Sequence, residues 1–169
     1  MVLSLLLLIA RSSGTSVREL RRSPTTGSYH AAQRHEGLDA IPGVLIARVD
    51  GPLFFADADR FRTTLEELAR QDGTPRAVVV DAESIYLTDT DGADILSQVA
   101  EELDAQGTSL VLAAVHPSVL ELWHRGGVID AIGANAVFDT VPDAVRALNG
   151  RTGSSRDGDH GGRPAYAGP

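Results

Sequence analysis

The sequence predicts an α/β fold with a central, mostly parallel sheet of about four to five strands and about four flanking helices. Apolar runs rich in β-branched residues, such as Ala77–Asp81 and Thr108–Val115, are typical of strands buried on both faces. Amphipathic segments with helical spacing lie between these runs. This alternation favours parallel pairing, because each helix returns the chain to the side of the sheet where the next strand begins.

The first half of the chain contains two expected strands and one helix. Val17–Arg22 is a weak edge strand with two apolar anchors, and 23–40 is a loop rich in turn formers. Val44–Val49 is a strand interrupted only by Arg48, and the turn 50–52 follows it. A helix then runs from about Asp57 to Gln71, where Asp72-Gly73 ends it.

The second half alternates more regularly. The expected elements are a strand at Ala77–Asp81, a helix from about Asp89 to Gln106, a strand at Thr108–Val115, a helix after His116, a short strand at Val137-Phe138 and a helix from Thr140 through Leu148. Val128–Ala134 is expected to be a connector. Apolar residues spaced three and four apart support each helix, and paired glycines or a proline mark their ends.

Composition excludes several classes of function. The formal net charge of −8 argues against general nucleic-acid binding, which needs a basic surface. The chain has no cysteine, so disulfides, thiol catalysis and cysteine-ligated zinc are excluded. A length of 169 residues is enough for one domain with a sizeable core and two tails.

The two ends differ from the centre. Val2–Ala10 is strongly apolar but shorter than the about 20 residues that span a bilayer. Because Arg11 and further arginines follow it, we interpret residues 1–12 as the end of a transmembrane helix, with an apolar leader or a buried helix as the alternative. The domain is then expected at 16–149, and the polar tail 150–169 is expected to be disordered.

The loop Thr88–Gly92 is the main candidate site. It follows a buried strand and opens a helix, which is where function collects in open α/β sheets. Asp89 is placed as the N-cap, while Thr88 and Asp91 have the spacing of a capping box, so the first helical residue stays open. Thr90 and Gly92 complete a loop that another backbone can approach closely.

Two Asp-x-Asp pairs, Asp57/Asp59 and Asp89/Asp91, could hold Mg²⁺ beside a phosphate, but helix capping explains both and is favoured. Phosphate-binding glycine loops, a nucleophile elbow and histidine pairs at metal spacing do not occur in the sequence. We therefore predict neither catalytic residues nor a metal site. The four histidines considered, His30, His35, His116 and His124, are interpreted as loop, cap and surface residues.

Three stretches together resemble a known family. Asp81–Gly92, DAESIYLTDTDG, resembles the signature of STAS domains, which occur in bacterial anti-sigma factor antagonists and in SulP-type anion (sulfate) transporters. Ile41–Asp59, IPGVLIARVDGPLFFADAD, is similar to the transporter pattern. Ser4–Arg11 followed by Val17–Pro24 looks like the end of the last membrane helix and the first STAS strand.

The resemblance implies a STAS-like fold and a non-enzymatic regulatory domain on the cytoplasmic face of the membrane, as part of an integral membrane protein. Its partners would be the transmembrane part of the same transporter or a cytoplasmic protein. Thr88–Gly92 would form the regulatory loop, and Gly51, Pro52, Phe54 and Asp57 the neighbouring nucleotide or partner edge. Some STAS domains bind purine nucleotides, which the resemblance permits here; no other cofactor is expected.

In the antagonists, the second hydroxyl residue of the loop is a serine that a kinase phosphorylates. Asp91 occupies that position here and Thr90 the first, so a phosphorylation switch at residue 91 is not expected, whereas Thr88 and Thr90 remain candidate acceptors. The alternative function is a stand-alone antagonist-like signalling protein. A third hypothesis is a phosphoacceptor or nucleotide-hydrolysing domain that uses its Asp pairs.

Overall fold

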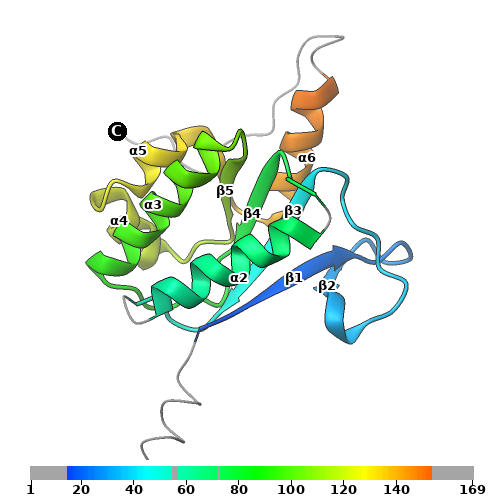
Figure 1. Ribbon diagram of the computed structural model, residues 1–169, viewed down its shortest axis with the longest axis horizontal. Helices are drawn as coiled ribbons and strands as arrows, with labels where there is room; N and C mark the ends of the chain where they lie inside the picture. The colour runs from blue at the N-terminus through cyan, green and yellow to red at the C-terminus, as the bar shows by residue number, and fades with distance from the viewer. Residues whose placement is uncertain (1–14, 55–56, 72, 154–169) are drawn as a thin grey trace, which may run out of the picture.

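Six strands form one sheet in the order β2-β1-β3-β4-β5-β6 in the computed structural model, which describes residues 15–54, 57–71 and 73–153 (Figure 1). The strands are β1 (Ser16–Arg22), β2 (Tyr29–Ala31), β3 (Val44–Asp50), β4 (Ala77–Asp81), β5 (Ser109–Ala113) and β6 (Val137–Phe138). β3 to β6 run parallel, while β1 lies antiparallel to β3, and β2 antiparallel to β1.

The helices lie on both faces of this sheet. They are α2 (Ala58–Gln71), α3 (Thr90–Ala105), α4 (Pro117–Arg125), α5 (Val128–Ile132) and α6 (Val141–Gly153), with short 3₁₀ turns at Ala32–Arg34 and Ala134–Ala136. Figure 1 shows α2, α3, α4 and α5 together on one side of the sheet and α6 alone on the other. The predicted α/β class with a mostly parallel sheet is confirmed.

The strand count was underestimated, because β2 falls in the segment 23–40 that we expected to be a loop. β2 has three half-buried residues and no alternating apolar pattern. It is defined by its pairing with β1, in which Leu20 lies opposite Ala31 and Arg22 opposite Tyr29. Likewise α5, in the expected connector, has five residues, too few to show a helical period.

Alternating residues of the strands build two apolar layers. Leu45, Ala47 and Val49 of β3 pack toward Phe61, Leu65, Leu96 and Trp123 on the face covered by α2 to α5. Val44 and Ile46 of the same strand pack on the other face, with Val79, Val111 and the α6 residues Val141, Ala144, Val145 and Leu148. This period of two is what a strand buried on both faces requires.

The parallel strands end together at one edge of the sheet, and the loops that follow them meet there. β3 leads into the connection to α2, and β4 leads into the loop that opens α3. Within the described residues no helix is long and apolar enough to cross a bilayer. The expected membrane stub at 1–12 and most of the expected tail at 150–169 lie outside the described residues.

Candidate functional site

The start of helix α3 agrees with one of the two alternatives that the sequence left open, the one in which Asp89 is the N-cap. Asp89 is extended, and its Oδ1 accepts a hydrogen bond of 2.7 Å from the backbone N–H of Gly92. Asp89 is therefore the N-cap and Thr90 the first helical residue. Thr90 and Asp91 are exposed, and the Asp91 carboxylate lies in the first turn, where the helix dipole favours negative charge.

Thr88 takes no part in a capping box. Its side chain is buried, and its hydroxyl donates a hydrogen bond of 2.8 Å to the carbonyl of Leu53, in the connection between β3 and α2. The backbone N–H of Leu53 in turn donates to the carbonyl of Leu87 at 3.1 Å, so that Leu53 and Thr88 form an isolated parallel bridge. The structure thus brings the two predicted segments together at Leu53 and Thr88.

Gly92 is required by this junction. A Cβ at residue 92 would overlap the carbonyl oxygen of Leu53 and lie 2.6 Å from Oγ1 of Thr88. Both distances are shorter than real Cβ contacts, and the nearer obstacle is backbone that the bridge holds in place. Gly92 therefore allows the start of α3 to lie directly against the neighbouring loop.

Asp57 fixes the other side of the same edge. Its carboxylate is buried and accepts a 3.1 Å hydrogen bond from the backbone N–H of Thr15, just before β1. The Thr15 hydroxyl donates to the carbonyl of Pro52, and the backbone N–H of Asp57 donates to the carbonyl of Phe54 at 2.9 Å. Asp57 therefore joins the beginning of β1 to the connection after β3. Gly51, at φ +107°, makes the turn into it.

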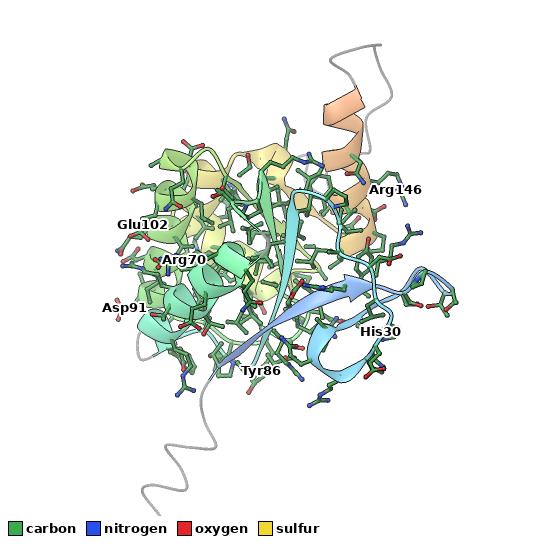
Figure 2. All side chains as sticks on the ribbon, turned by 45° about the vertical axis from the view of Figure 1, so that its right-hand side comes forward. His30, Arg70, Tyr86, Asp91, Glu102 and Arg146 are labelled. Carbon is green, nitrogen blue, oxygen red and sulfur yellow. The ribbon has the colours of Figure 1, made fainter. Side chains whose placement is uncertain are left out.

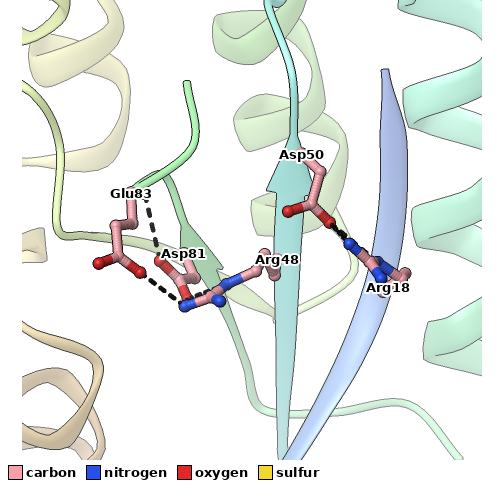
Figure 3. Close-up of polar contacts among 5 residues, drawn as sticks. All are labelled: Arg18, Arg48, Asp50, Asp81 and Glu83. Atoms are coloured by element: carbon pink, nitrogen blue, oxygen red, sulfur yellow. Dashed lines mark hydrogen bonds and ion pairs between the residues drawn. The ribbon is translucent and has the colours of Figure 1, made fainter. Parts of the chain in front are cut away.

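A cluster of ion pairs lies where β3 and β4 end, and sequence analysis missed it (Figure 3). Arg48 Nε donates to Oδ2 of Asp81 at 2.8 Å, and Arg48 Nη2 donates to Oε2 of Glu83 at 2.8 Å. Oδ1 of Asp81 accepts from the Glu83 backbone N–H at 3.2 Å. Arg48 thus holds the first residues of the loop that leads to α3.

The charges in this cluster favour the paired state. Burial by itself would lower the pKa of Arg48, but the hydrogen bond to Asp81 and the negative charges of Asp81, Glu83 and Asp50 outweigh burial and raise that pKa. The signal in the sequence was the equal spacing: Arg48 and Asp81 each come four residues after their strand begins, and they are register partners. Arg18 Nε on β1 adds a second pair, 2.8 Å from Oδ2 of Asp50.

Three of the histidine candidates make local contacts, and one of them, His116, lies at this same edge because the loop after β5 opens α4 there. His30 and His35 lie near each other, with ring centroids 5.0 Å apart, and Nδ1 of His116 bonds the hydroxyl of Ser118 at 2.9 Å. Among the described residues no group of three or more histidines and acids could hold a metal ion.

A hollow of about 340 Å³ lies between α4, α5 and β6, and a smaller one of about 130 Å³ lies between α2 and α3.

Comparison with known proteins agrees with this fold. Residues 38–144 match the family described as the STAS domain. A protein named "Probable sulfate transporter" from Mycobacterium tuberculosis is 31% identical over 150 residues, which cover 88% of this chain and 27% of that protein. The chain therefore spans about a quarter of the length of this relative.

Two solved structures extend the comparison. A sulfate transporter family protein from Wolinella succinogenes is 27% identical, with a TM-score of 0.59 over 70% of this chain and 93% of that one. The murine anion transporter Slc26a9 shares the fold at 22% identity, with a TM-score of 0.75 over 88% of this chain and 24% of that one. Anti-sigma factor antagonists share the fold as well.

Proposed function

The chain belongs to the STAS domain family, and on that premise we propose that it is the cytoplasmic regulatory and interaction domain of a SulP-type anion transporter. One observation carries the proposal: similarity to a bacterial protein named as a sulfate transporter covers 88% of this chain, beyond the segment 38–144 that the STAS family matches. The match of 27% identity to a sulfate transporter family protein supports the same choice.

The geometry favours binding over catalysis. At the carboxyl edge of the sheet the polar groups serve structure: Asp89 caps α3, Thr88 donates to Leu53, and Asp57 accepts from Thr15. What this edge offers a partner is exposed Thr90 and Asp91 on a loop held by those bonds. We therefore propose a docking surface that uses shape and charge and performs no bond-making step.

A stand-alone antagonist-like signalling protein is the alternative. Residue 91, where the antagonists have the phosphorylated serine, is an Asp in this chain and offers no hydroxyl. The Thr88 hydroxyl is buried and bonded to Leu53, so Thr90 is the exposed hydroxyl of the loop. Thr90 is accordingly the acceptor that this alternative would have to use.

The reading frame and a transport assay test the proposal. We expect several apolar segments of about 20 residues encoded upstream in the same frame. We also expect the full-length protein to restore uptake of radiolabelled sulfate, or of another anion in a panel, to bacteria that lack their own uptake systems. A frame without such segments, or a full-length protein that moves none of the anions, would favour the alternative.

Nucleotide sensing is a finer part of the proposal, and it has a separate test. Isotope-labelled protein is titrated with ATP, ADP, GTP and GDP while backbone amide signals are followed. Binding at the proposed edge would move the amides of 51–57 and 88–92 together, because the Leu53–Thr88 bridge joins the two segments. Saturating nucleotide that moves no amide would remove nucleotide from the proposal and leave the docking role standing.

A further inference from the structure

The hollow between α4, α5 and β6 has the size and the lining of a small-molecule site. Its volume of about 340 Å³ lies near the lower end of the range of about 300–1,000 Å³ that is typical of such sites. Leu120 of α4, Ile129 of α5 and Val137 of β6 give it an apolar floor, in which Ile129 and Val137 are buried. The hollow therefore suits the apolar part of a small metabolite.

The α4 wall of this hollow is held in place by the rest of the fold. Trp123, on another face of α4, is fully buried in the core. Just after α4, a Cβ at Gly126 would lie 2.9 Å from Cβ of Ala93, so the end of α4 lies directly against α3. Figure 1 shows α4 and α5 beside α3 on the same side of the sheet. The hollow is therefore preformed, as small-molecule sites usually are.

Two charges of opposite sign line the hollow without pairing. Glu121 and Arg125 of α4 are both exposed and four residues apart, with the acid first, which is the arrangement that favours an ion pair along a helix. Glu66 and Arg70 of α2 have the same arrangement, and their ion pair measures 2.8 Å. Glu121 and Arg125 instead form no ion pair with each other or with any other described residue. Both charges are therefore available to a ligand.

The smaller hollow between α2 and α3 shows the opposite arrangement. Its charged lining residues pair with one another: Nε of Arg62 lies 3.5 Å from Oε2 of Glu102, and Arg70 pairs with Glu66. Figure 2 shows Arg70 and Glu102 on the same side of the molecule. With a volume of about 130 Å³, this hollow offers a ligand neither comparable space nor an unpaired charge from these four residues.

The charges and the floor together define the chemistry of the ligand. Residues four apart on a helix have Cβ atoms about 5–6 Å apart, so one small head group between Glu121 and Arg125 can contact both side chains. A carboxylate can pair with the Arg125 guanidinium through two parallel hydrogen bonds, and an ammonium group can pair with Glu121. The remainder of the ligand has to be apolar, because it covers the apolar floor.

We propose that the hollow between α4, α5 and β6 binds a free amino acid with a large apolar side chain, such as leucine or phenylalanine. Its ammonium group pairs with Glu121 and its carboxylate with Arg125, while its side chain lies against the apolar floor. A free amino acid fits better than a protein segment, because a chain terminus presents only one of the two charges and an internal segment neither. The inference goes beyond the proposed function and does not depend on it.

Titration of the isotope-labelled full chain, followed through its backbone amide signals, tests this site. The ligands are leucine, phenylalanine, N-acetyl-leucine, which lacks the ammonium group, and leucinamide, which lacks the carboxylate. We expect the two amino acids to move the amides of α4, α5 and 134–137 saturably, and each derivative to bind about fivefold more weakly than leucine, because each loses one exposed ion pair. Amino acids that move no amide of these segments up to their solubility limit, or derivatives that bind as well as leucine, would overturn the inference.

Two substitutions test which charge meets which group of the ligand. Glu121→Gln should weaken leucine binding about fivefold and leave the binding of N-acetyl-leucine unchanged, since this ligand has no ammonium group to lose. Arg125→Gln should weaken leucine in the same way and leave leucinamide unchanged. Glu66→Gln and Arg70→Gln, at the same spacing on α2, are matched controls that should bind leucine normally. Leucine affinity that is equal in all four variants would contradict the proposed pairing and overturn the inference.

Filling the hollow gives a third test that does not involve charge. Ala134 lines the hollow and is exposed, so Ala134→Phe adds volume at the rim without replacing a buried residue of the floor. We expect this variant to lose the leucine-dependent shifts while the amide signals of the sheet keep their positions. Normal leucine binding in the filled variant would overturn the inference. The reading frame and the anion uptake assay test the proposed function separately, so either conclusion can fail while the other stands.

Discussion

The two Asp-x-Asp pairs, Asp57/Asp59 and Asp89/Asp91, look alike in the sequence, but their first carboxylates make different contacts in the fold. Asp89 binds locally: its carboxylate accepts from Gly92, three residues later, and Asp91 remains exposed. Asp57 binds at long range: its carboxylate is buried and accepts from Thr15, 42 residues earlier. One motif therefore leaves an acid available to a partner, whereas the other holds β1 against the connection to α2.

This difference follows from what lies next to each helix start. The beginning of α2 is covered by the residue that enters β1, so Asp57 meets a backbone donor from outside its own helix. The beginning of α3 lies at the open rim, and its own first turn supplies the donor. The comparison predicts a graded series of effects on stability, which begins with the glycine that joins the two regions.

Gly92→Ala is expected to have the largest effect. The added Cβ would overlap the Leu53 carbonyl and crowd Thr88, and such overpacking costs about 3 kcal/mol in the free energy of unfolding. Chemical denaturation monitored by circular dichroism measures it. Gly150→Ala in α6, where a Cβ meets nothing within 4 Å, is the matched control and should be neutral or slightly stabilising. Equal stability of the two variants would contradict the close approach at residue 92.

Asp57→Ala is expected to rank second. It leaves the buried Thr15 N–H without its acceptor, which costs about 2 kcal/mol. Asp57→Asn keeps an oxygen in the same place and should recover most of this loss. Chemical denaturation of the unmodified protein and of the Ala and Asn variants measures the two losses. An Asn variant as unstable as the Ala variant would show that the charge of Asp57 matters more than the hydrogen bond.

Asp89→Ala is expected to cost less than Asp57→Ala, about 1 kcal/mol, because the lost bond is an N-cap at a partly solvated helix start. Asp89→Ser retains a capping oxygen and serves as the control. If removing Asp89 proved as costly as removing Asp57, the distinction between the local and the long-range acid would be wrong.

Asp91→Lys is expected to have the smallest effect on stability, about 0.5 kcal/mol, through the reversed charge in the first turn of α3. Thermal unfolding compares it with Glu101→Lys, which lies near the other end of the helix. In the full-length protein the same change is expected to alter anion uptake. Unchanged thermal stability together with unchanged uptake would count against a role for Asp91 at this edge.

The sequence by itself determined the elements that have a repeating pattern. The run of β-branched residues at Val78, Val79 and Val80 predicts a buried strand, and the spacing of Ile95, Leu96 and Val99 predicts the buried face of α3. The hydrogen bond between Asp89 and Gly92 could also be predicted from the sequence, because an N-cap and its partner are three residues apart. β2 and α5 were not predicted, because elements of three and five residues are too short to show a periodic pattern of apolar residues.

Only the tertiary structure decided which distant residues meet. The Arg48–Asp81 pair depends on the register between β3 and β4, the Thr88–Leu53 contact on the side-by-side placement of two loops, and the Asp57–Thr15 bond on the path of β1. Short-range patterns reflect backbone periodicity, which each segment carries in its own residues. Contacts between segments instead depend on how the whole sheet packs, and it is those contacts that leave Tyr86, Leu87 and Asp91 facing outward.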